Sequence, residues 1–176
     1  REIKSFYAGS AAQQTPGFFK VRKARSRQYP AKAVSFDAAK GEILGFAGLV
    51  GAGRSEIAKA IVGLDSTAQS DTEVWLGDER IGIRTAREAI DQGLCLVPED
   101  RRGEGLIVEM SVRENISLPS LGRLARFGLI RRDRERQTAE EQVASLKVKT
   151  PHTETLALNL SGGNQQKVVI GKWLLT

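Results

Sequence analysis

The chain has 176 residues, of which 40% are hydrophobic and 27% are charged, the proportions of an ordinary globular domain with a sizeable core. Its longest apolar stretch, residues 43–50, is far shorter than the roughly 20 residues of a membrane-spanning helix, and its one cysteine excludes an internal disulfide. The net charge of +6 is concentrated in residues 1–40, which carry nine Lys or Arg against two acids; a solvated linker or edge explains this excess best, and contact with nucleic acid or anionic lipid is the alternative.

The start of the chain predicts a linker followed by three strands. Residues 1–17 are small and polar without a sustained period, which is typical of a linker or a loosely fixed start. Short strands are predicted over 18–21 and 32–38. After a turn at Gly41, the apolar run within KGEILGFAGLV, residues 40–50, predicts a strand that is buried on both faces at the centre of a mostly parallel sheet.

A glycine-rich loop, GLVGAGRSE, follows at residues 48–56. A helix is predicted over 54–64, because apolar residues recur there at helical spacing, and Gly63 is its expected C-cap. A loop between a buried strand and a helix is the setting in which glycines cradle a phosphate group, whereas the alternative is a tight turn without a ligand. Three residues would let backbone N–H groups reach phosphate oxygens beside the positive end of the helix: Gly48, Gly51 and Gly53.

The loop has the spacing of the phosphate-binding sequence G-x-x-x-x-G-K-[ST], but Arg54 stands in the place of the lysine. Arginine keeps the positive charge and spreads it over a wide planar group, so we expect nucleotide binding to survive better than catalysis. Ser55 is placed to ligate Mg²⁺. The loop therefore predicts a nucleotide site that is weakened rather than lost.

The middle of the chain predicts a hairpin, a helix and another buried strand. Residues 72–81 favour two strands joined by a turn at a Gly-Asp pair. TAREAIDQG, residues 85–93, predicts a helix with a capping box at its start. The apolar run in residues 94–100 predicts a short buried strand, with Cys95 as a small core residue.

The remainder of the chain predicts helices. SVRENISL, residues 111–118, begins with a second capping box, and residues 131–148 form a longer helix with a thin apolar stripe. Residues 160–176 start with a serine and two glycines and then become helical. Strands and helices alternate in the first hundred residues or so and helices dominate afterwards, which indicates an α/β core with an α-rich insertion.

The start of the last helix, LSGGNQQKV, is a second place at which backbone N–H groups could meet an anion. Ser161 precedes the two glycines, and the N–H groups of Gly162 to Asn164 would lie at the positive end of the helix. Taken alone, the motif is also compatible with a plain N-cap after a flexible lead-in. Its position about a hundred residues after the phosphate loop, directly behind a helix-rich stretch, favours the anion site.

Together these segments resemble the nucleotide-binding domain of an ATP-binding cassette (ABC) transporter. LSGGNQQKV matches the signature motif of the family, GLVGAGRSE matches its Walker A loop with Lys replaced by Arg, and VPEDRRGEGL stands at its Q-loop, with Glu99 in the glutamine position. With GEILGFAGLVGAGR and SVRENISL, these motifs resemble the second, C-terminal cassette in the tandem ATPase subunits of bacterial monosaccharide importers of the ribose, galactose, xylose and arabinose type. The resemblance covers residues 18–176, and residues 1–17 resemble the connector from a first cassette.

The resemblance implies an α/β fold, with a P-loop NTPase core of the ABC type, an N-terminal antiparallel β subdomain and an α-helical subdomain. Residues 18–110 would form the β subdomain and the P-loop core, and residues 111–176 the helical subdomain with the signature helix. The family continues after the signature into a Walker B strand, a D-loop and a switch histidine, and this sequence ends at Thr176 before them. We therefore expect no catalytic residue among these residues and no steady ATP hydrolysis by this chain alone.

In this family two cassettes face each other head to tail, and each ATP lies between the Walker A loop of one and the signature helix of the other. The resemblance thus implies ATP and Mg²⁺ as ligands, with Arg54 and Glu99 in a degenerate site, where the Glu99 carboxylate would repel the γ-phosphate. Ser161 and the two glycines after it would complete the competent site of the first cassette. The expected nucleotide contacts are Gly48, Gly51, Ala52, Gly53, Arg54, Ser55, Glu56, Tyr29 (stacked on adenine), Glu99, Ser161, Gly162, Gly163, Asn164 and Gln165, with Ser55 also on Mg²⁺.

The resemblance also implies partners. The first cassette of the same subunit would complete the two sites, membrane-spanning permease subunits would contact residues near Glu99 to Gly105, and a periplasmic sugar-binding protein would act indirectly. These partners place the chain at the cytoplasmic face of the inner membrane as a peripheral protein, without nucleic acid. The alternatives are an importer of nucleosides or other small solutes, a non-catalytic nucleotide-binding assembly module, and a nucleic-acid-associated protein that uses the basic start of the chain.

Overall fold

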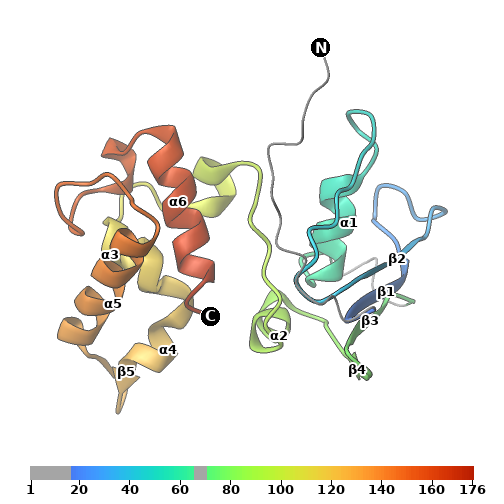
Figure 1. Cartoon of the computed structure of the whole chain (residues 1–176), viewed down its shortest axis with the longest axis horizontal. Coiled ribbons are helices and arrows are strands. Elements are labelled where there is room, and N and C mark those ends of the chain that lie inside the picture. Colours follow the sequence, from blue (N-terminus) through green and yellow to red (C-terminus); the bar gives the residue numbers. More distant parts are fainter. Residues whose placement is uncertain (1–16, 66–70) are drawn as a thin grey trace. The chain divides into compact units, whose positions relative to one another are not determined.

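A computed structural model describes residues 17–65 and 71–176 (Figure 1). The chain divides between Leu94 and Cys95 into two compact units, and each unit is described by itself. The division expected from the sequence lies later, after residue 110. The linker predicted over residues 1–17 lies outside the described residues apart from Gly17.

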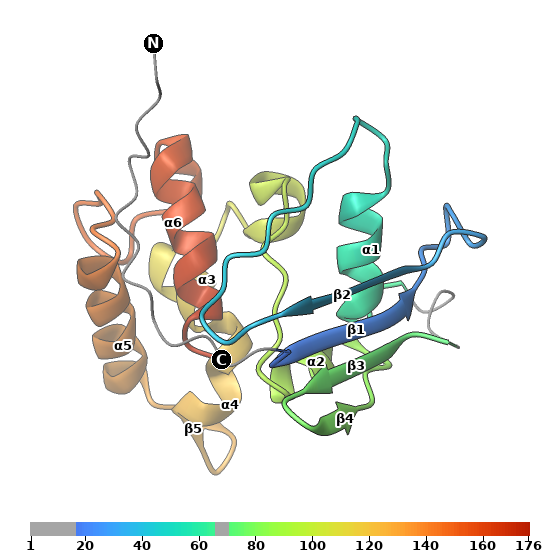
Figure 2. The ribbon, with the colours of Figure 1, turned by 45° about the vertical axis from the view of Figure 1, so that its right-hand side comes forward.

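The first unit is built on a four-stranded antiparallel sheet with the strand order β2-β1-β3-β4 (Figure 2). The register sets Val21 of β1 opposite Phe36 of β2 and Val74 of β3, so apolar side chains of three strands share one face. These strands confirm the two strands and the hairpin predicted for this part of the sequence. Their bounds are β1 (Phe19–Ala24), β2 (Val34–Ala38), β3 (Glu73–Leu76) and β4 (Glu79–Ile81).

Helix α1 (Arg54–Ile61) packs against β1, and its apolar side chains close the core of this unit (Figure 2). Burial of these side chains is the main force that holds the helix on the sheet, at about 25 cal/mol for each Å² of apolar surface removed from water. The phosphate loop directly precedes α1, so this packing also fixes the loop at one end. The buried core residues are Val21, Ala24, Ile61, Val74 and Ile81.

The end of α1 has the hydrogen-bond pattern of a Schellman motif. The N–H of Leu64 donates to the carbonyl of Lys59 at 2.9 Å, and the N–H of Gly63 donates to the carbonyl of Ala60 at 3.2 Å. Gly63 has φ 74°, a left-handed conformation that favours glycine. The C-cap itself is Val62, and Gly63, the predicted C-cap, is the left-handed residue directly after it that ends the helix. A Cβ on Gly63 would also lie 2.7 Å from the carbonyl carbon of Thr85, so no side chain fits there.

Helix α2 (Ala86–Asp91) begins at the predicted N-cap. The Thr85 hydroxyl accepts a hydrogen bond from the N–H of Glu88 at 3.2 Å, as a capping box requires. The return bond differs from the prediction, because the Glu88 carboxylate accepts from the N–H of Arg84 at 2.7 Å instead of from Thr85. The backbone N–H that Glu88 accepts from therefore lies one residue before the position that a capping box specifies.

The strand predicted over residues 40–50 is wrong in this structure. The turn at Gly41 is present, with φ 79°, but no strand is formed in residues 42–49. Ile43 is 97% exposed and Val50 is 100% exposed. An apolar run becomes a buried strand only when neighbouring strands pair with it and helices cover both faces, and the antiparallel sheet does not extend to this segment. Phe46, edge-on to Phe36 with ring centroids 4.8 Å apart, is an aromatic anchor of the segment on the sheet.

The second predicted buried strand, residues 94–100, is wrong for the same reason. Residues 94–98 belong to no strand, Val97 is 38% exposed, and Cys95 is exposed rather than buried. Among the described residues every strand pairing is antiparallel, so the predicted parallel sheet centre is not formed there.

The second unit is helical, as predicted. Its core gathers apolar side chains from three helices, including Ile116, Ala139 and Val168, and the helices expected near residues 111–118, 131–148 and 160–176 are all present. The elements of this unit are η1 (Arg101–Gly105), α3 (Val112–Ser117), η2 (Leu118–Ser120), α4 (Leu121–Leu124), β5 (Ala125–Arg126), β6 (Leu129–Ile130), α5 (Arg132–Ser145), η3 (Ala157–Asn159) and α6 (Gly162–Trp173).

A buried ion-pair network joins α3 to α5. Arg113 on α3 donates from Nη1 to the carboxylate of Glu135 on α5 at 2.6 Å, and Ser117 donates to the same carboxylate at 2.7 Å. Glu154 accepts from Arg113 Nε at 2.7 Å. Glu135 is 3% exposed, so its charge is stable there only because these donors surround it. The network therefore adds polar contacts between α3 and α5 to the few apolar contacts of α5.

Candidate nucleotide-binding site

The predicted phosphate loop directly precedes α1 in the first unit. Gly51 has φ 78° and Gly53 has φ 86°, so both glycines use left-handed backbone conformations that other residues rarely adopt. Gly53 is the N-cap and offers no side chain to the first turn. Backbone N–H groups at such a helix start face outward beside the positive end of the helix, which suits a phosphate group.

Arg54, the residue in the lysine position, folds back over the loop. Its Nη1 donates to the carbonyl of Gly48 at 2.8 Å, and its Cδ would lie 3.8 Å from a Cβ on Gly48. The guanidinium is therefore kept beside the loop, and its charge supplements the helix end. Ser55 and Glu56 are half-buried in the first turn of α1, and Ala52 closes the turn through its N–H to Leu49 at 3.0 Å.

Tyr29 is brought against the phosphate loop although it lies 22 residues before Gly51, its partner there. Its hydroxyl donates to the carbonyl of Gly51 at 2.6 Å, and its ring carbon Cδ2 would lie 2.8 Å from a Cβ on Gly53. The Nζ of Lys32 lies 5.4 Å from the ring centroid. The tyrosine thus supports the loop directly, and its stacking on adenine stays a prediction.

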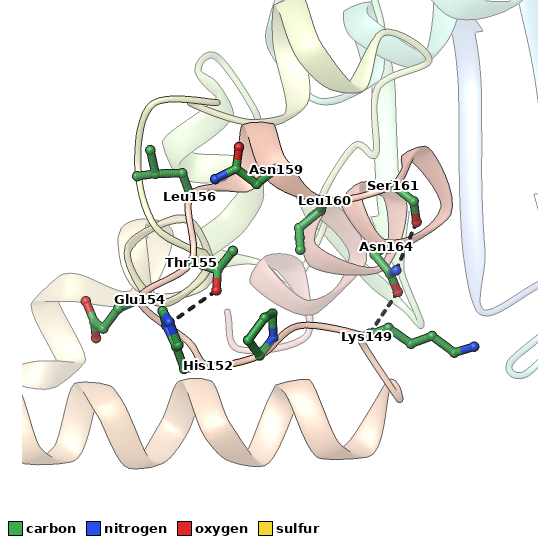
Figure 3. Close-up of a pocket in the computed structure, with 10 residues that line it drawn as sticks. Lys149, His152, Glu154, Thr155, Leu156, Asn159, Leu160, Ser161 and Asn164 are labelled. Atoms are coloured by element: carbon green, nitrogen blue, oxygen red, sulfur yellow. Dashed lines mark hydrogen bonds between the residues drawn. The ribbon is translucent and has the colours of Figure 1, made fainter.

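The signature motif forms the start of α6 in the second unit (Figure 3). Ser161 is the N-cap in an extended conformation, but its hydroxyl makes no capping bond and instead accepts from Asn164 Nδ2 at 2.9 Å. The Asn164 carbonyl oxygen accepts from the N–H of Lys149 at 2.9 Å. Within the described residues, the N–H groups of Gly162 and Gly163 have no backbone or side-chain acceptor. They remain open to an anion.

An open pocket of about 540 Å³ adjoins this helix start (Figure 3). Ser161 and Asn164 lie at one side of it, and the loop before the signature supplies Lys149 and His152. His152 is exposed and its Nδ1 lies 3.4 Å from the Thr155 hydroxyl. The pocket is polar where it meets the helix start, so a ligand at the signature motif has room beside it.

Gln165 differs from the other expected contacts because it is fully buried. Its Oε1 accepts from Arg101 Nε at 3.2 Å and from Arg102 Nε at 3.3 Å, and its Nε2 donates to the carbonyl of Ala157 at 2.9 Å. It lies on the inner face of α6 together with Val168. Its side chain supports the site from within and does not face a ligand.

The segment after Glu99 is tied to α6, which sequence reasoning missed. Asp100 accepts from the N–H groups of Gly103 and Arg102 at 3.0 Å each, and these bonds lower the pKa of its carboxyl group. Lys172 Nζ donates to the carbonyl of Gly105, and burial lowers the pKa of this ammonium group. Glu99 itself is exposed. The partners are more than sixty residues apart in sequence, so no local pattern could reveal them.

Two observations concern metal ligands and membrane-spanning helices. In the part of the chain that the structure describes, no three His, Cys, Asp or Glu side chains are grouped to hold a metal ion, and the Mg²⁺ contact of Ser55 stays a prediction. The same residues include no helix that is long and apolar enough to cross a membrane.

Comparison with known proteins shows close relatives along the whole chain. The ribose import ATP-binding protein of Rhodopirellula baltica is 42% identical over 181 residues, which cover all of this chain and 35% of the relative. The xylose import ATP-binding protein of Thermoanaerobacter pseudethanolicus is 43% identical and covers 94% of this chain and 34% of the relative. The ribose import ATP-binding protein of Bacillus subtilis is 40% identical over 99% of this chain. The chain therefore spans about a third of the length of these curated relatives.

A solved structure and a family profile agree with these relatives. The ATP-binding cassette MJ0796, a dimer in a post-hydrolysis state with ADP and Pi, aligns over 89% of this chain and 69% of its own, with a TM-score of 0.65 and 22% identity, and so confirms the P-loop cassette fold expected from the sequence. The profile of the family described as ABC transporter matches residues 31–176. That range includes both the phosphate loop and the signature motif, and the chain belongs to the ABC transporter family.

Proposed function

We propose that this chain is part of the second ATP-binding cassette in the energy-coupling subunit of a bacterial monosaccharide importer. The open start of α6 at Ser161 to Gly163 is the observation that carries the proposal, because it offers unpaired N–H groups at the positive end of a helix. The ribose and xylose import relatives, which match over nearly the whole chain, support a sugar as the imported solute.

On the Walker A side, the loop residues Gly51 and Gly53 would cradle the phosphates of one ATP, with the Arg54 guanidinium beside them. Ser55 would share Mg²⁺ with the phosphate oxygens. A broad guanidinium that is already bonded to the Gly48 carbonyl is a poorer partner for the γ-phosphate than a free lysine ammonium. The geometry therefore favours a site that binds nucleotide and turns it over slowly.

On the signature side, the chain would contact a second ATP held by the first cassette of the same subunit. The Ser161 hydroxyl and the N–H groups of Gly162 and Gly163 would donate to the terminal phosphate of that ATP. The Nδ2 of Asn164 donates to the Ser161 hydroxyl at 2.9 Å and so orients this hydroxyl. Closure of the two cassettes on ATP would bring these donors to the phosphate.

Contact with membrane-spanning permease subunits would involve the segment from Glu99 to Gly105, in which Glu99, Asp100 and Glu104 are exposed. This segment is bonded to α6 through Gln165 and Lys172, which supports a link between the permease and the signature motif. In this arrangement the chain works at the cytoplasmic face of the membrane as a peripheral subunit, and a periplasmic sugar-binding protein acts on the other side.

The test is deletion of the gene that encodes the full-length protein, followed by uptake of radiolabelled ribose, xylose, arabinose, galactose and a nucleoside. We expect uptake of one or two of the monosaccharides to fall to background and to return when the gene is restored. Loss of nucleoside uptake with normal sugar uptake would replace the sugar with a nucleoside. No change in any uptake would contradict an import function.

A further inference from the structure

The guanidinium of Arg101 lies against the first turn of α6. Arg101 is not among the nucleotide contacts expected from the sequence. If Gly162 had a Cβ, that atom would lie 2.8 Å from Nη2 and 3.3 Å from Cζ of Arg101. The guanidinium therefore packs directly on the Cα of a signature glycine. Any larger residue at position 162 would displace it.

The position of Arg101 is fixed from the interior of the unit. Its Nε donates to Gln165 Oε1 at 3.2 Å, and the Gln165 amide is itself oriented by its bond to the Ala157 carbonyl at 2.9 Å. Gln165 is fully buried, so this anchor has one orientation. Because Nε is bonded on the inner side, the Nη end of the guanidinium is the part that reaches the helix start.

This placement sets the guanidinium charge beside a second positive pole, with the Asp100 carboxylate as a nearby counter-charge. The N-terminus of a helix carries a partial positive charge, and cations are stabilised at the opposite end. A partly buried hydrogen bond nevertheless holds a full positive charge beside the open N–H groups of Gly162 and Gly163. A phosphate group between them would accept hydrogen bonds from both the guanidinium and the N–H groups of the helix start.

The geometry points to Arg101 as a substrate-binding residue, which donates from its Nη atoms to the terminal phosphate of the ATP at the signature motif. This inference rests on the proposed function of Ser161 to Gly163. Arg101 would supply the planar, charged donor that Arg54 supplies weakly on the Walker A side. Gln165 is then a positioning residue, because it acts on the phosphate only through Arg101.

The matched control is Arg102, which donates to the same Gln165 oxygen at 3.3 Å, whereas the three atoms nearest to a Cβ on Gly162 all belong to Arg101. In the full-length protein assayed without permease subunits, Arg101→Gln should lower kcat/KM for ATP by about tenfold or more, and Arg101→Lys should recover part of the loss because it keeps the charge. Arg102→Gln should change kcat/KM by less than about twofold, since a merely structural role through Gln165 is shared by both arginines. Equal losses for Arg101→Gln and Arg102→Gln would overturn the inference.

The inhibition constant of inorganic tripolyphosphate is a second measurement, and it would not change if Arg101 had only a structural role. This inhibition constant should rise about tenfold in Arg101→Gln and stay unchanged in Arg102→Gln, because the inhibitor presents phosphate oxygens without a base.

The variant Ser161→Arg separates this inference from the proposed function. Loss of turnover in Ser161→Arg with normal turnover in Arg101→Gln contradicts the Arg101 contact alone, whereas normal turnover in both contradicts the signature site as well.

A double-mutant cycle with Gly162→Ala completes the test. The added methyl would displace the guanidinium, so Gly162→Ala and Arg101→Gln should each impair turnover and their combination should be little worse than the more damaging of the two. Fully multiplicative losses would mean that the two residues act independently, and this result would also overturn the inference.

Discussion

Arg113 on α3 and Glu135 on α5 form a hydrogen-bonded ion pair at 2.6 Å, with side chains that are 9% and 3% exposed. Glu135 has no other guanidinium partner among the described residues, although Ser117 also donates to it. Removal of one member of a buried pair leaves the other charge uncompensated, which is the costly case.

We expect Glu135→Ala to lower the free energy of unfolding by about 3 kcal/mol, because Arg113 would lose its most buried counter-charge. Urea denaturation followed by circular dichroism measures this change. Glu140→Ala, an exposed carboxylate on the same helix, is the control and should cost less than about 0.5 kcal/mol. Similar losses for the two variants would show that the pair has no special role.

The helical unit should lose stability in acid. The N–H of Ser111, and then its hydroxyl, lower the pKa of Glu114, and Arg113 lowers the pKa of Glu154. A carboxyl group with a lowered folded pKa contributes stability above its ordinary value of about 4.3, and this stability is lost as the pH falls through the folded value. Thermal melting should be nearly constant from pH 7 to about pH 5 and should fall below that. Glu114→Gln should flatten the fall, and an unchanged pH profile in this variant would contradict the assignment.

The two glycine-bearing motifs should differ in their importance for turnover. In the full-length protein, Ser161→Ala should lower ATP turnover by about tenfold or more, because it removes a hydrogen bond to a charged phosphate. Arg54→Ala should lower it by less than about threefold, because this guanidinium is already bonded to the Gly48 carbonyl. Steady-state phosphate release is the measurement. A larger effect from Arg54→Ala would reverse the assignment of the strong and weak sites.

Gly63 should tolerate no side chain. With φ 74° and a hypothetical Cβ 2.7 Å from the Thr85 carbonyl carbon, Gly63→Ala would introduce both backbone strain and a backbone clash. We expect a loss of about 2 kcal/mol or more in unfolding free energy. Gly82→Ala is the matched control, because nothing lies within 4 Å of a Cβ there. A small loss at Gly63 would show that the end of α1 relaxes easily.

Local chemistry explains which parts of the fold the sequence predicts. The Ser111–Glu114 capping box and the left-handed Gly63 at the end of α1 depend on residues no more than five positions apart, and both are present as expected. The strand expected at residues 40–50 depends on neighbouring strands and helices, and the sequence of the segment itself does not specify these neighbours. The same apolar run is compatible with a sheet centre and with the exposed segment observed at Ile43.

The candidate site shows the same limit. The glycine spacings locate both helix starts, because backbone geometry near a phosphate leaves few alternatives to glycine. The burial of Gln165 and its pairing with Arg101, 64 residues away, follow from how η1 packs on α6. A hydrogen bond between residues so far apart has no signature in the sequence, so the residues that support the site from the interior were missed.

The attachment of η1 to α6 has a mechanical consequence. One end of η1 is bonded to the buried Gln165 near the start of the helix, and the other end is bonded to Lys172 about two turns later. Two anchors so far apart along one helix resist both twist and tilt. A displacement of η1 at the exposed Glu104 would therefore move α6 with it, and the start of α6 at Ser161 would move as part of the same rigid body.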